Sequence, residues 1–170
     1  MKIRDEIMVD RDQIRECVAQ AFSEVVHSQQ TENAIIDGLR AANALTLSLV
    51  AEKENEIIGY IAFSSVLIDG KDLNWHGLGP VAVIPRHQRR GIGQQLIRAG
   101  LAKLREMGSA GCVLLGEPDY YARFGFRNEP HLSLAGVPPQ YFQALSLTGS
   151  LVPAGEVTYH DAFNAKPEIE

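Results

Sequence analysis

The chain has 170 residues, of which 45% are hydrophobic and 22% are charged, and its formal net charge is −5 at pH 7. This length and composition are ordinary for a globular protein, so we expect a single domain over residues 1–170. The negative charge argues against general nucleic-acid binding, because neutralising phosphates requires a basic face. The sequence also argues against a membrane protein, since no apolar run approaches the roughly twenty residues that a spanning helix needs.

Two further features indicate a cytoplasmic protein without a bound metal. The segment Met1–Glu6 carries charges where a signal peptide needs an apolar stretch. Cys17 and Cys112 are the only cysteines, and they fit neither a disulfide framework nor a metal-ligand cluster. We therefore expect reduced thiols, a cytoplasmic location and no metal site.

The first part of the chain predicts a short strand and two helices. Lys2–Arg4 suits the strand, and apolar residues recur at helical spacing in Asp10–Phe22 and again in Thr31–Ala42. The link between these helices, Ser23–Gln30, is mostly polar and contains His27. We interpret this link as a surface connection, although it could also border a substrate site.

The middle of the chain predicts an antiparallel meander. Leu45–Lys53 and Glu56–Ile68 have the composition of a hairpin, and a turn then leads into a strand that ends at Val83. Gly79-Pro80 interrupts this strand, because proline has no ladder N–H and glycine within a strand often marks a bulge. Pairing should loosen there, and the free backbone groups could bind an extended ligand; the alternative is an edge strand or a bend without a ligand.

The second half predicts a crossover followed by weaker signals. Gly91–Met107 is the strongest helix, and Cys112–Leu115 is a short buried strand that a right-handed crossover would place parallel to the strand ending at Val83. The remaining predicted elements are a helical turn at Tyr120–Phe124, a strand at Leu132–Leu134, a short helical turn at Pro138–Leu145 and a last strand at Glu156–His160.

A basic, glycine-containing loop joins the strand ending at Val83 to the strongest helix. Its sequence is Gln88-Arg89-Arg90-Gly91-Ile92-Gly93. Glycines let the backbone approach a phosphate closely, and the free N–H groups of a helix start attract anions. A dinucleotide-binding loop would need a glycine where Leu96 stands, and a P-loop would need Gly-Lys-Ser/Thr. The loop therefore predicts a phosphate site of neither kind.

The pattern Gln/Arg-x-x-Gly-x-Gly/Ala, preceded by Val81-Ala82-Val83-Ile84-Pro85, resembles the acetyl-CoA site of the GNAT superfamily of N-acetyltransferases. Leu114–Phe126 and Gly155–Phe163 are similar to a branch of bacterial predicted N-acetyltransferases. The resemblance implies a mixed α/β fold, in which a central, mostly antiparallel sheet splits near strands 4 and 5 and carries helices on both faces. It also implies acetyl-CoA as co-substrate and acetyl transfer to a primary amine by direct attack in a ternary complex.

The same resemblance assigns cofactor-binding residues. The pantetheine arm would pair with the backbone of Val81, Ala82 and Val83. The pyrophosphate would be held by the loop and the first helical residues, namely Gln88, Arg89, Arg90, Gly91, Ile92, Gly93 and Gln94.

Tyr121 precedes Gly125 in a Tyr-x-x-x-Gly-Phe arrangement, and the resemblance implies that Tyr121 is the general acid. A thiol with a pKa near ~8.5 leaves more readily when a hydroxyl donates to the developing charge. Tyr120 is interpreted as a packing or cofactor contact.

The general base is less well indicated. Many relatives carry a glutamate on the fourth strand, but Trp75–Pro80 contains no carboxylate. His76, of ordinary pKa near ~6.5, is the candidate base, acting directly or through water. Glu117 and Asp119 are alternatives, whereas His160 and Cys112 are interpreted as structural.

Two other functions are weighed against the enzyme. A non-catalytic sensor or scaffold would bind CoA or acyl-CoA without turnover, and a different nucleotide-phosphate enzyme is disfavoured by the failed glycine register. The acceptor is open among a small metabolite amine, an antibiotic-like amine and a protein N-terminus or lysine. The oligomeric state is also open, and a homodimer is compatible with the sequence.

Overall fold

A twisted, mostly antiparallel sheet runs through the molecule in the computed structural model, which describes residues 1–26 and 28–166. Within these ranges the sheet has eight strands, with the order β1-β2-β3-β4-β5-β7, while β8 pairs with both β3 and β6. The strands are β1 (Lys2–Asp5), β2 (Leu45–Lys53), β3 (Glu56–Ile68), β4 (Lys71–Val83), β5 (Gly111–Leu115), β6 (Leu132–Leu134), β7 (Phe142–Ser146) and β8 (Gly155–Thr158).

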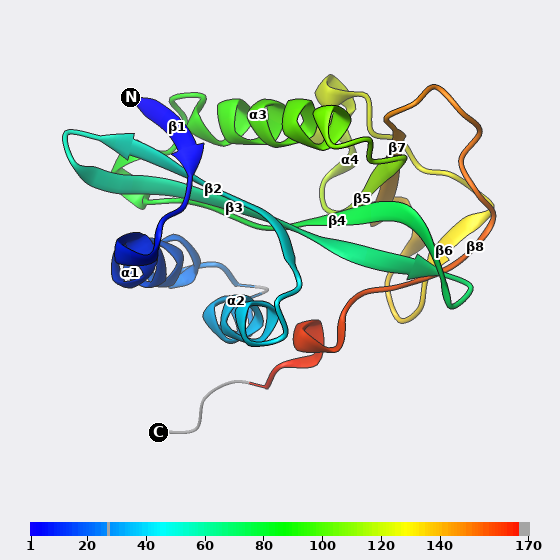
Figure 1. Cartoon of the computed structure of the whole chain (residues 1–170), viewed down its shortest axis with the longest axis horizontal. Coiled ribbons are helices and arrows are strands. Elements are labelled where there is room, and N and C mark those ends of the chain that lie inside the picture. Colours follow the sequence, from blue (N-terminus) through cyan, green and yellow to red (C-terminus); the bar gives the residue numbers. More distant parts are fainter. Residues whose placement is uncertain (27, 167–170) are drawn as a thin grey trace.

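Helices cover both faces of this sheet, as expected. α1 (Arg11–Phe22) and α2 (Glu32–Ala41) lie on one face, and α3 (Ile92–Glu106) and the single turn α4 (Pro118–Tyr121) lie on the other (Figure 1). The apolar stripe of α3 is buried, because residues such as Leu96 lie at helical spacing and face the sheet. No helix within the described ranges is both long enough and apolar enough to cross a bilayer.

The sheet splits between β4 and β5. These strands are parallel, as predicted, but only Trp75–Gly77 of β4 pairs with Gly111–Val113 of β5. From Leu78 onward, the edge of β4 that faces β5 has no strand partner. On the other edge, the register with β3 shifts between Leu78 and Val81, which confirms the predicted bulge at Gly79-Pro80.

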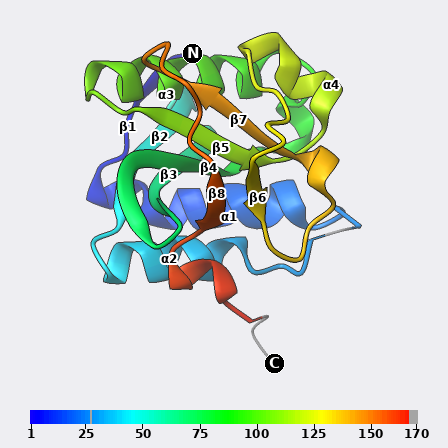
Figure 2. The ribbon, with the colours of Figure 1, turned by 90° about the vertical axis from the view of Figure 1, so that its right-hand side faces the viewer.

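One predicted element is wrong. The segment Pro138–Leu145 was expected to form a helical turn, but only Pro139–Tyr141 makes a 3-10 turn, and Phe142–Ser146 is strand β7. β7 pairs antiparallel with β5 along its whole length, as Figure 2 shows. Pairing with β5 decides the outcome, because Phe142, Gln143 and Ala144 are all buried and their burial alone shows no strand alternation.

The C-terminal segment brings the last strand to the face that carries α2. β8 pairs with the end of β3 and, in parallel, with β6. The following 3-10 turn, Asp161–Asn164, packs on α2, where a Cβ built on Gly38 would lie 3.0 Å from the Cβ of Ala162 (Figure 2). The last strand ends at Thr158, and the ring of the next residue, Tyr159, packs on Gly77 of β4.

Candidate functional site

A cavity of about 320 Å³ lies at the start of α3. Its lining comes from one stretch of chain and one residue of α4: Val83, His87–Arg89, Gly91–Gln94 and Tyr120. We call it the loop cavity. Most of the predicted cofactor-binding residues therefore meet in one place, whereas Val81, Ala82 and Arg90 do not line it.

Backbone N–H groups are the main chemical feature of the loop cavity. The first turn of a helix leaves its N–H groups without intrahelical acceptors, and the loop before α3 adds further ones. Within the described residues, the N–H groups of Arg89, Arg90, Gly91, Ile92, Gly93 and Gln94 have no hydrogen-bond acceptor, and the intrahelical pattern resumes at Gln95, which donates to Gly91. Consecutive unpaired N–H groups at a helix start are suited to an anion such as a pyrophosphate.

The unpaired edge of β4 adjoins these N–H groups. The side-chain amide of Gln88 donates to the carbonyl of Val83 at 2.9 Å, so this carbonyl lies on the open edge rather than in the ladder with β3. Because hydrogen-bonding direction alternates along an antiparallel strand, Val81 shares the open edge and Ala82 faces β3. Thus Gln88 fixes the loop against the strand, and Val81 and Val83 offer backbone groups to a ligand.

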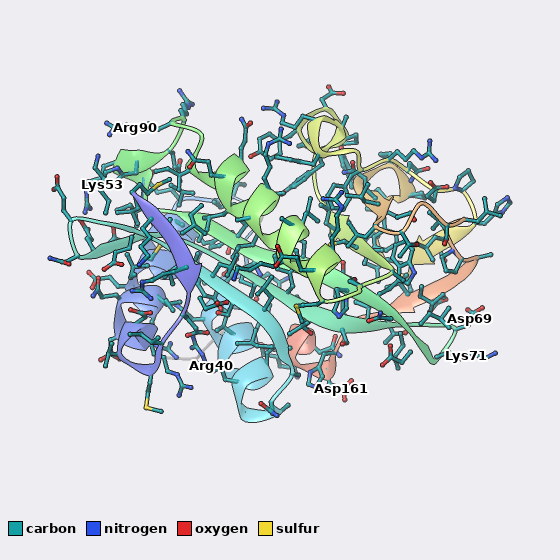
Figure 3. The ribbon with its side chains drawn as sticks, turned by 45° about the horizontal axis from the view of Figure 1, so that its top comes forward. Arg40, Lys53, Asp69, Lys71, Arg90 and Asp161 are labelled. Carbon is teal, nitrogen blue, oxygen red and sulfur yellow. The ribbon has the colours of Figure 1, made fainter. Side chains whose placement is uncertain are left out.

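Positive charge surrounds the same cavity. Arg89 lines it, and Arg90 projects from the outer side of the loop (Figure 3). Partial desolvation, together with the nearby charges of Arg90 and Arg86, lowers the pKa of His87. Arg123 lies over the ring of Tyr120, 4.6 Å from its centroid, at the α4 side of the cavity. Neutral His87 and the arginines leave a local surface that favours an anion within an acidic protein.

Tyr120 and Tyr121 have different surroundings, although they are neighbours in α4. The Tyr120 hydroxyl lies 3.6 Å from the position of a Cβ built on Gly93, so Tyr120 reaches the loop cavity. Tyr121 packs instead on Gly116, where a Cβ would collide with its ring. Burial is the main cause that raises the pKa of Tyr121 to about 12, so its hydroxyl is protonated at neutral pH. Among the described residues this hydroxyl has no hydrogen-bond partner, which leaves its proton available.

His76 lies in the paired part of β4 and lines neither the loop cavity nor the apolar cavity described below. Its ring is buried, and Nδ1 lies 2.7 Å from the Ser109 hydroxyl beyond the end of α3. Burial lowers the pKa of His76 against a smaller opposing effect of Asp72. These contacts hold the ring between α3 and the sheet.

The other candidates for proton transfer are dispersed. Glu117 and Asp119 are exposed on the solvent side of α4. His160 accepts a hydrogen bond from the N–H of Ala162 at 3.0 Å and so caps the last 3-10 turn, while His27 lies outside the described residues. Cys112 is fully buried, and burial raises its pKa well above the usual range, in accord with a core residue.

A second cavity, of about 310 Å³, opens on the α2 side of the split. Five separate parts of the chain line it: Ile35, Leu78–Pro80, Leu115, Leu134, and the pair Tyr159 and Phe163. We call it the apolar cavity. Gly77, the last residue of β4 that pairs with β5, allows Tyr159 to lie directly on the strand, because a Cβ there would collide with the ring. Sequence reasoning did not assign this cavity. Leu115, Tyr159 and Phe163 lie in segments that carry the family resemblance, but no local pattern shows that the five parts of the chain meet.

The chain matches the family model described as Acetyltransferase (GNAT) family over residues 11–126. This chain belongs to the GNAT acetyltransferase family. Among curated GNAT proteins, it is 37% identical to N-acetyltransferase YhbS of Escherichia coli K12 over 170 residues, covering 96% of this chain and 99% of YhbS.

Two solved GNAT structures share the fold and much of the sequence. A GNAT family acetyltransferase from Brucella melitensis, in complex with acetyl-CoA, is 50% identical with a TM-score of 0.86, covering 95% of this chain and 97% of that one. Escherichia coli YhbS in complex with CoA is 35% identical with a TM-score of 0.86, covering 96% and 92%. The expected family, its bacterial N-acetyltransferase branch and the split-sheet GNAT fold are thereby confirmed.

Proposed function

We propose that this protein transfers an acetyl group from acetyl-CoA to a primary amine. One observation carries the donor half of this proposal: Arg89 and Gly91–Gln94, whose N–H groups are unpaired, line a cavity beside the open edge of β4. An acyl-CoA offers a pyrophosphate for the first feature and the amides of its pantetheine arm for the second. The acetyl-CoA and CoA complexes of the two similar structures support this choice of donor.

The chain's own residues would act mainly by binding and orientation. Bound acetyl-CoA supplies a thioester, whose carbonyl carbon bonds to the amine nitrogen as the C–S bond breaks. The loop N–H groups would hold the pyrophosphate, and Val81 and Val83 would fix the extended arm along β4. Holding the two reactants together in this geometry lowers the barrier by removing much of the entropic cost of their encounter.

We assign Tyr121 the role of assisting the leaving thiolate. Its hydroxyl is protonated because burial raises the pKa of Tyr121 to about 12. A phenol of that pKa donates a hydrogen bond to a thiolate of pKa near ~8.5 more readily than it gives up its proton completely. We therefore expect Tyr121 to stabilise the charge on sulfur as the C–S bond breaks, and the proton lost by the amine then completes the thiol.

We assign no residue as the base that deprotonates the amine. His76 was predicted as a base, but its Nδ1 contact with Ser109 and its place outside both cavities give that role no support. Among the residues that the structure describes, no carboxylate lines the apolar cavity, which adjoins the split. We also propose a cytoplasmic setting, which the free, buried thiols of Cys17 and Cys112 support.

Calorimetry followed by a thiol assay tests the function. We expect acetyl-CoA to bind with a 1:1 stoichiometry, ATP and NAD to compete poorly, and free CoA thiol to appear when an accepted amine is added. Absence of acetyl-CoA binding would overturn the proposal. Tight binding without thiol release across a broad amine panel would instead favour the non-catalytic sensor.

A further inference from the structure

The walls of the apolar cavity carry almost no polar chemistry. Its side chains are aliphatic or aromatic, and the hydroxyl of Tyr159 is the only polar side-chain group among the lining residues. β4 and β5 both line the cavity with residues that follow the last pair between them: Leu78–Pro80 of β4 and Leu115 of β5. A molecule in this cavity therefore reaches the split from the face opposite the loop cavity.

The charged residues of α2, the helix nearest the cavity, are all engaged elsewhere. Glu32 accepts a hydrogen bond from Ser28, Asp37 pairs with Arg15, and Arg40 donates to Glu6 at 2.6 Å. None of these groups lines the cavity, and the apolar side chain of Ile35 is what α2 offers to it.

Within the described residues, which end at 166, the C-terminal segment likewise contributes no charged side chain to the lining of the cavity. His160 is occupied by the N–H of Ala162, and Asp161 is exposed and does not line the cavity (Figure 3). Burial raises the pKa of Tyr159 far above neutrality, so its hydroxyl is uncharged. An acceptor with a carboxylate, a phosphate or a second ammonium would find no opposite charge among the described lining residues, and burying such a charge unpaired is strongly unfavourable.

We infer that the acceptor is a small primary amine carried on a single hydrocarbon or aryl group, and that the amine enters the apolar cavity as the neutral free base. This inference rests on the proposed function. A volume of about 310 Å³ is at the small end of ligand pockets, which suits one ring with a short chain. Amino acids, polyamines and aminoglycosides are excluded because each carries further charge.

The inference also accounts for the missing base. An apolar environment disfavours the ammonium form, so the proton of R–NH₃⁺ passes to bulk water as the amine enters. When the N–C bond forms and the C–S bond breaks, the nitrogen loses one further proton and the CoA thiolate gains one. The products are an N-substituted acetamide and free CoA. The transfer itself neither takes up nor releases a proton, because the thiolate gains the proton that the nitrogen loses. A protein carboxylate is not needed.

A matched set of amines tests the acceptor class. Phenethylamine, phenylalanine and spermidine each present a primary amine, but the second adds a carboxylate and the third adds further ammonium groups. We expect kcat/KM for phenethylamine to exceed the other two by about 100-fold or more. Equal or better turnover of phenylalanine or spermidine would overturn the inference. If acetyl-CoA binds but phenethylamine is not acetylated, the inference also fails, while the donor assignment stands on the calorimetry.

The pH profile separates a neutral amine from an enzymatic base. With two apolar amines of different pKa, kcat/KM is expected to rise about tenfold per pH unit and to level off at each amine's own pKa. A levelling point that is the same for both amines would indicate a base on the protein and would overturn the entry of a neutral amine.

A substitution that places a charge at the mouth of the apolar cavity tests the same inference from the side of the protein. Leu115 is 51% exposed, so Leu115→Asp should fold normally while adding a carboxylate to the lining. We expect kcat/KM for phenethylamine to fall about tenfold or more, with acetyl-CoA affinity unchanged. Leu151→Asp, at a residue that is 95% exposed and outside this cavity, is the matched control and should change neither quantity. Unchanged turnover in Leu115→Asp would overturn the inference.

Discussion

The loop cavity and the apolar cavity lie on opposite sides of the same split in the sheet, and they are built differently. The loop cavity takes all but one of its lining residues from 83–94, and its chemistry is mainly that of backbone N–H groups. The apolar cavity takes its lining from α2, β4, β5, β6 and the C-terminal segment, and its chemistry is that of side-chain carbon.

The difference follows from what each cavity would have to recognise. A pyrophosphate is the same in every acyl-CoA, so a fixed set of N–H groups at a helix start can bind it, and the side chains of the loop matter less. An acceptor differs from one enzyme to the next, and side chains from distant segments can change independently of one another. We therefore expect substitutions in the loop cavity to affect donor binding, and substitutions around the apolar cavity to affect acceptor choice.

The largest effect is expected from filling the loop cavity. A Cβ on Gly93 would meet no atom closer than 3.6 Å, so Gly93→Leu can be accommodated in the free protein while its side chain projects into the space for the ligand. We expect acetyl-CoA affinity to fall about 100-fold, measured by calorimetry. The free energy of unfolding should stay constant or rise, because leucine has the higher helix propensity.

Gln95→Leu is the matched control for this substitution. Gln95 lies two residues after Gly93 in α3, is exposed, and does not line the loop cavity. The same new side chain should leave acetyl-CoA affinity unchanged there. Similar losses in both variants would show that the loop cavity is not the donor site.

Removing one hydroxyl tests the chemistry without disturbing either cavity. Tyr121→Phe is expected to lower kcat about 100-fold, because the thiolate would lose its hydrogen-bond donor, while acetyl-CoA affinity is unchanged. Stopped assays of thiol release and calorimetry measure the two quantities. Tyr120→Phe is the comparison, since its ring packs edge-on against that of Tyr121 at 4.9 Å between centroids while its hydroxyl reaches the loop cavity instead. Equal losses of kcat in both variants would contradict a specific role for Tyr121.

How well sequence predicted these regions depends on whether their residues are contiguous. The strongest helix and the hairpin of β2 and β3 were predicted to within one or two residues, because their hydrophobic periodicity is long and local. The loop was recognised because its motif, Gln88–Gly93, is likewise contiguous in the sequence. In contrast, β7 is only five residues long, and its pairing with β5 decides between strand and helix. That pairing joins distant parts of the chain and leaves no local pattern.

The same limit applies to single residues of the candidate site. His76 and Gly77 are adjacent, yet they face opposite sides of the sheet, toward Ser109 and Tyr159 respectively. Which side faces a cavity depends on the register with β3 and β5, and a shift of one residue would exchange the two. The sequence alone therefore indicated an imidazole near the fourth strand without showing that it packs beneath α3.

A smaller effect is expected where the loop is held against β4. Gln88→Leu removes the donor to the Val83 carbonyl and leaves that carbonyl unpaired at the open edge. A hydrogen bond of this kind contributes about 1 kcal/mol, so acetyl-CoA affinity should fall about fivefold. Calorimetry with Gln95→Leu as the reference measures the difference. An affinity equal to that of the reference would show that Gln88 does not hold the donor site in shape.

The smallest effect on acetyl transfer is expected far from both cavities, at the contact that anchors the start of α1. The Asp10 carboxylate accepts hydrogen bonds from Arg4, at 2.7 and 3.0 Å, and from the N–H of Ile7 at 2.8 Å. The bonds from Arg4 are the main cause that lowers the pKa of Asp10. Asp10→Asn should leave kcat and acetyl-CoA affinity unchanged and should lower the free energy of unfolding by about 2 kcal/mol at pH 7.

The sign of the pH dependence distinguishes this contact from a simple loss of packing. Because the folded pKa of Asp10 lies below its unfolded value near ~3.9, its stabilisation is present above that pH and is lost as the pH falls toward the folded pKa. Urea titrations of both proteins should therefore differ at pH 7 and converge below about pH 4. A difference that persists unchanged into acid would mean that the asparagine disturbs packing and that the charge of Asp10 contributes little to anchoring the start of α1.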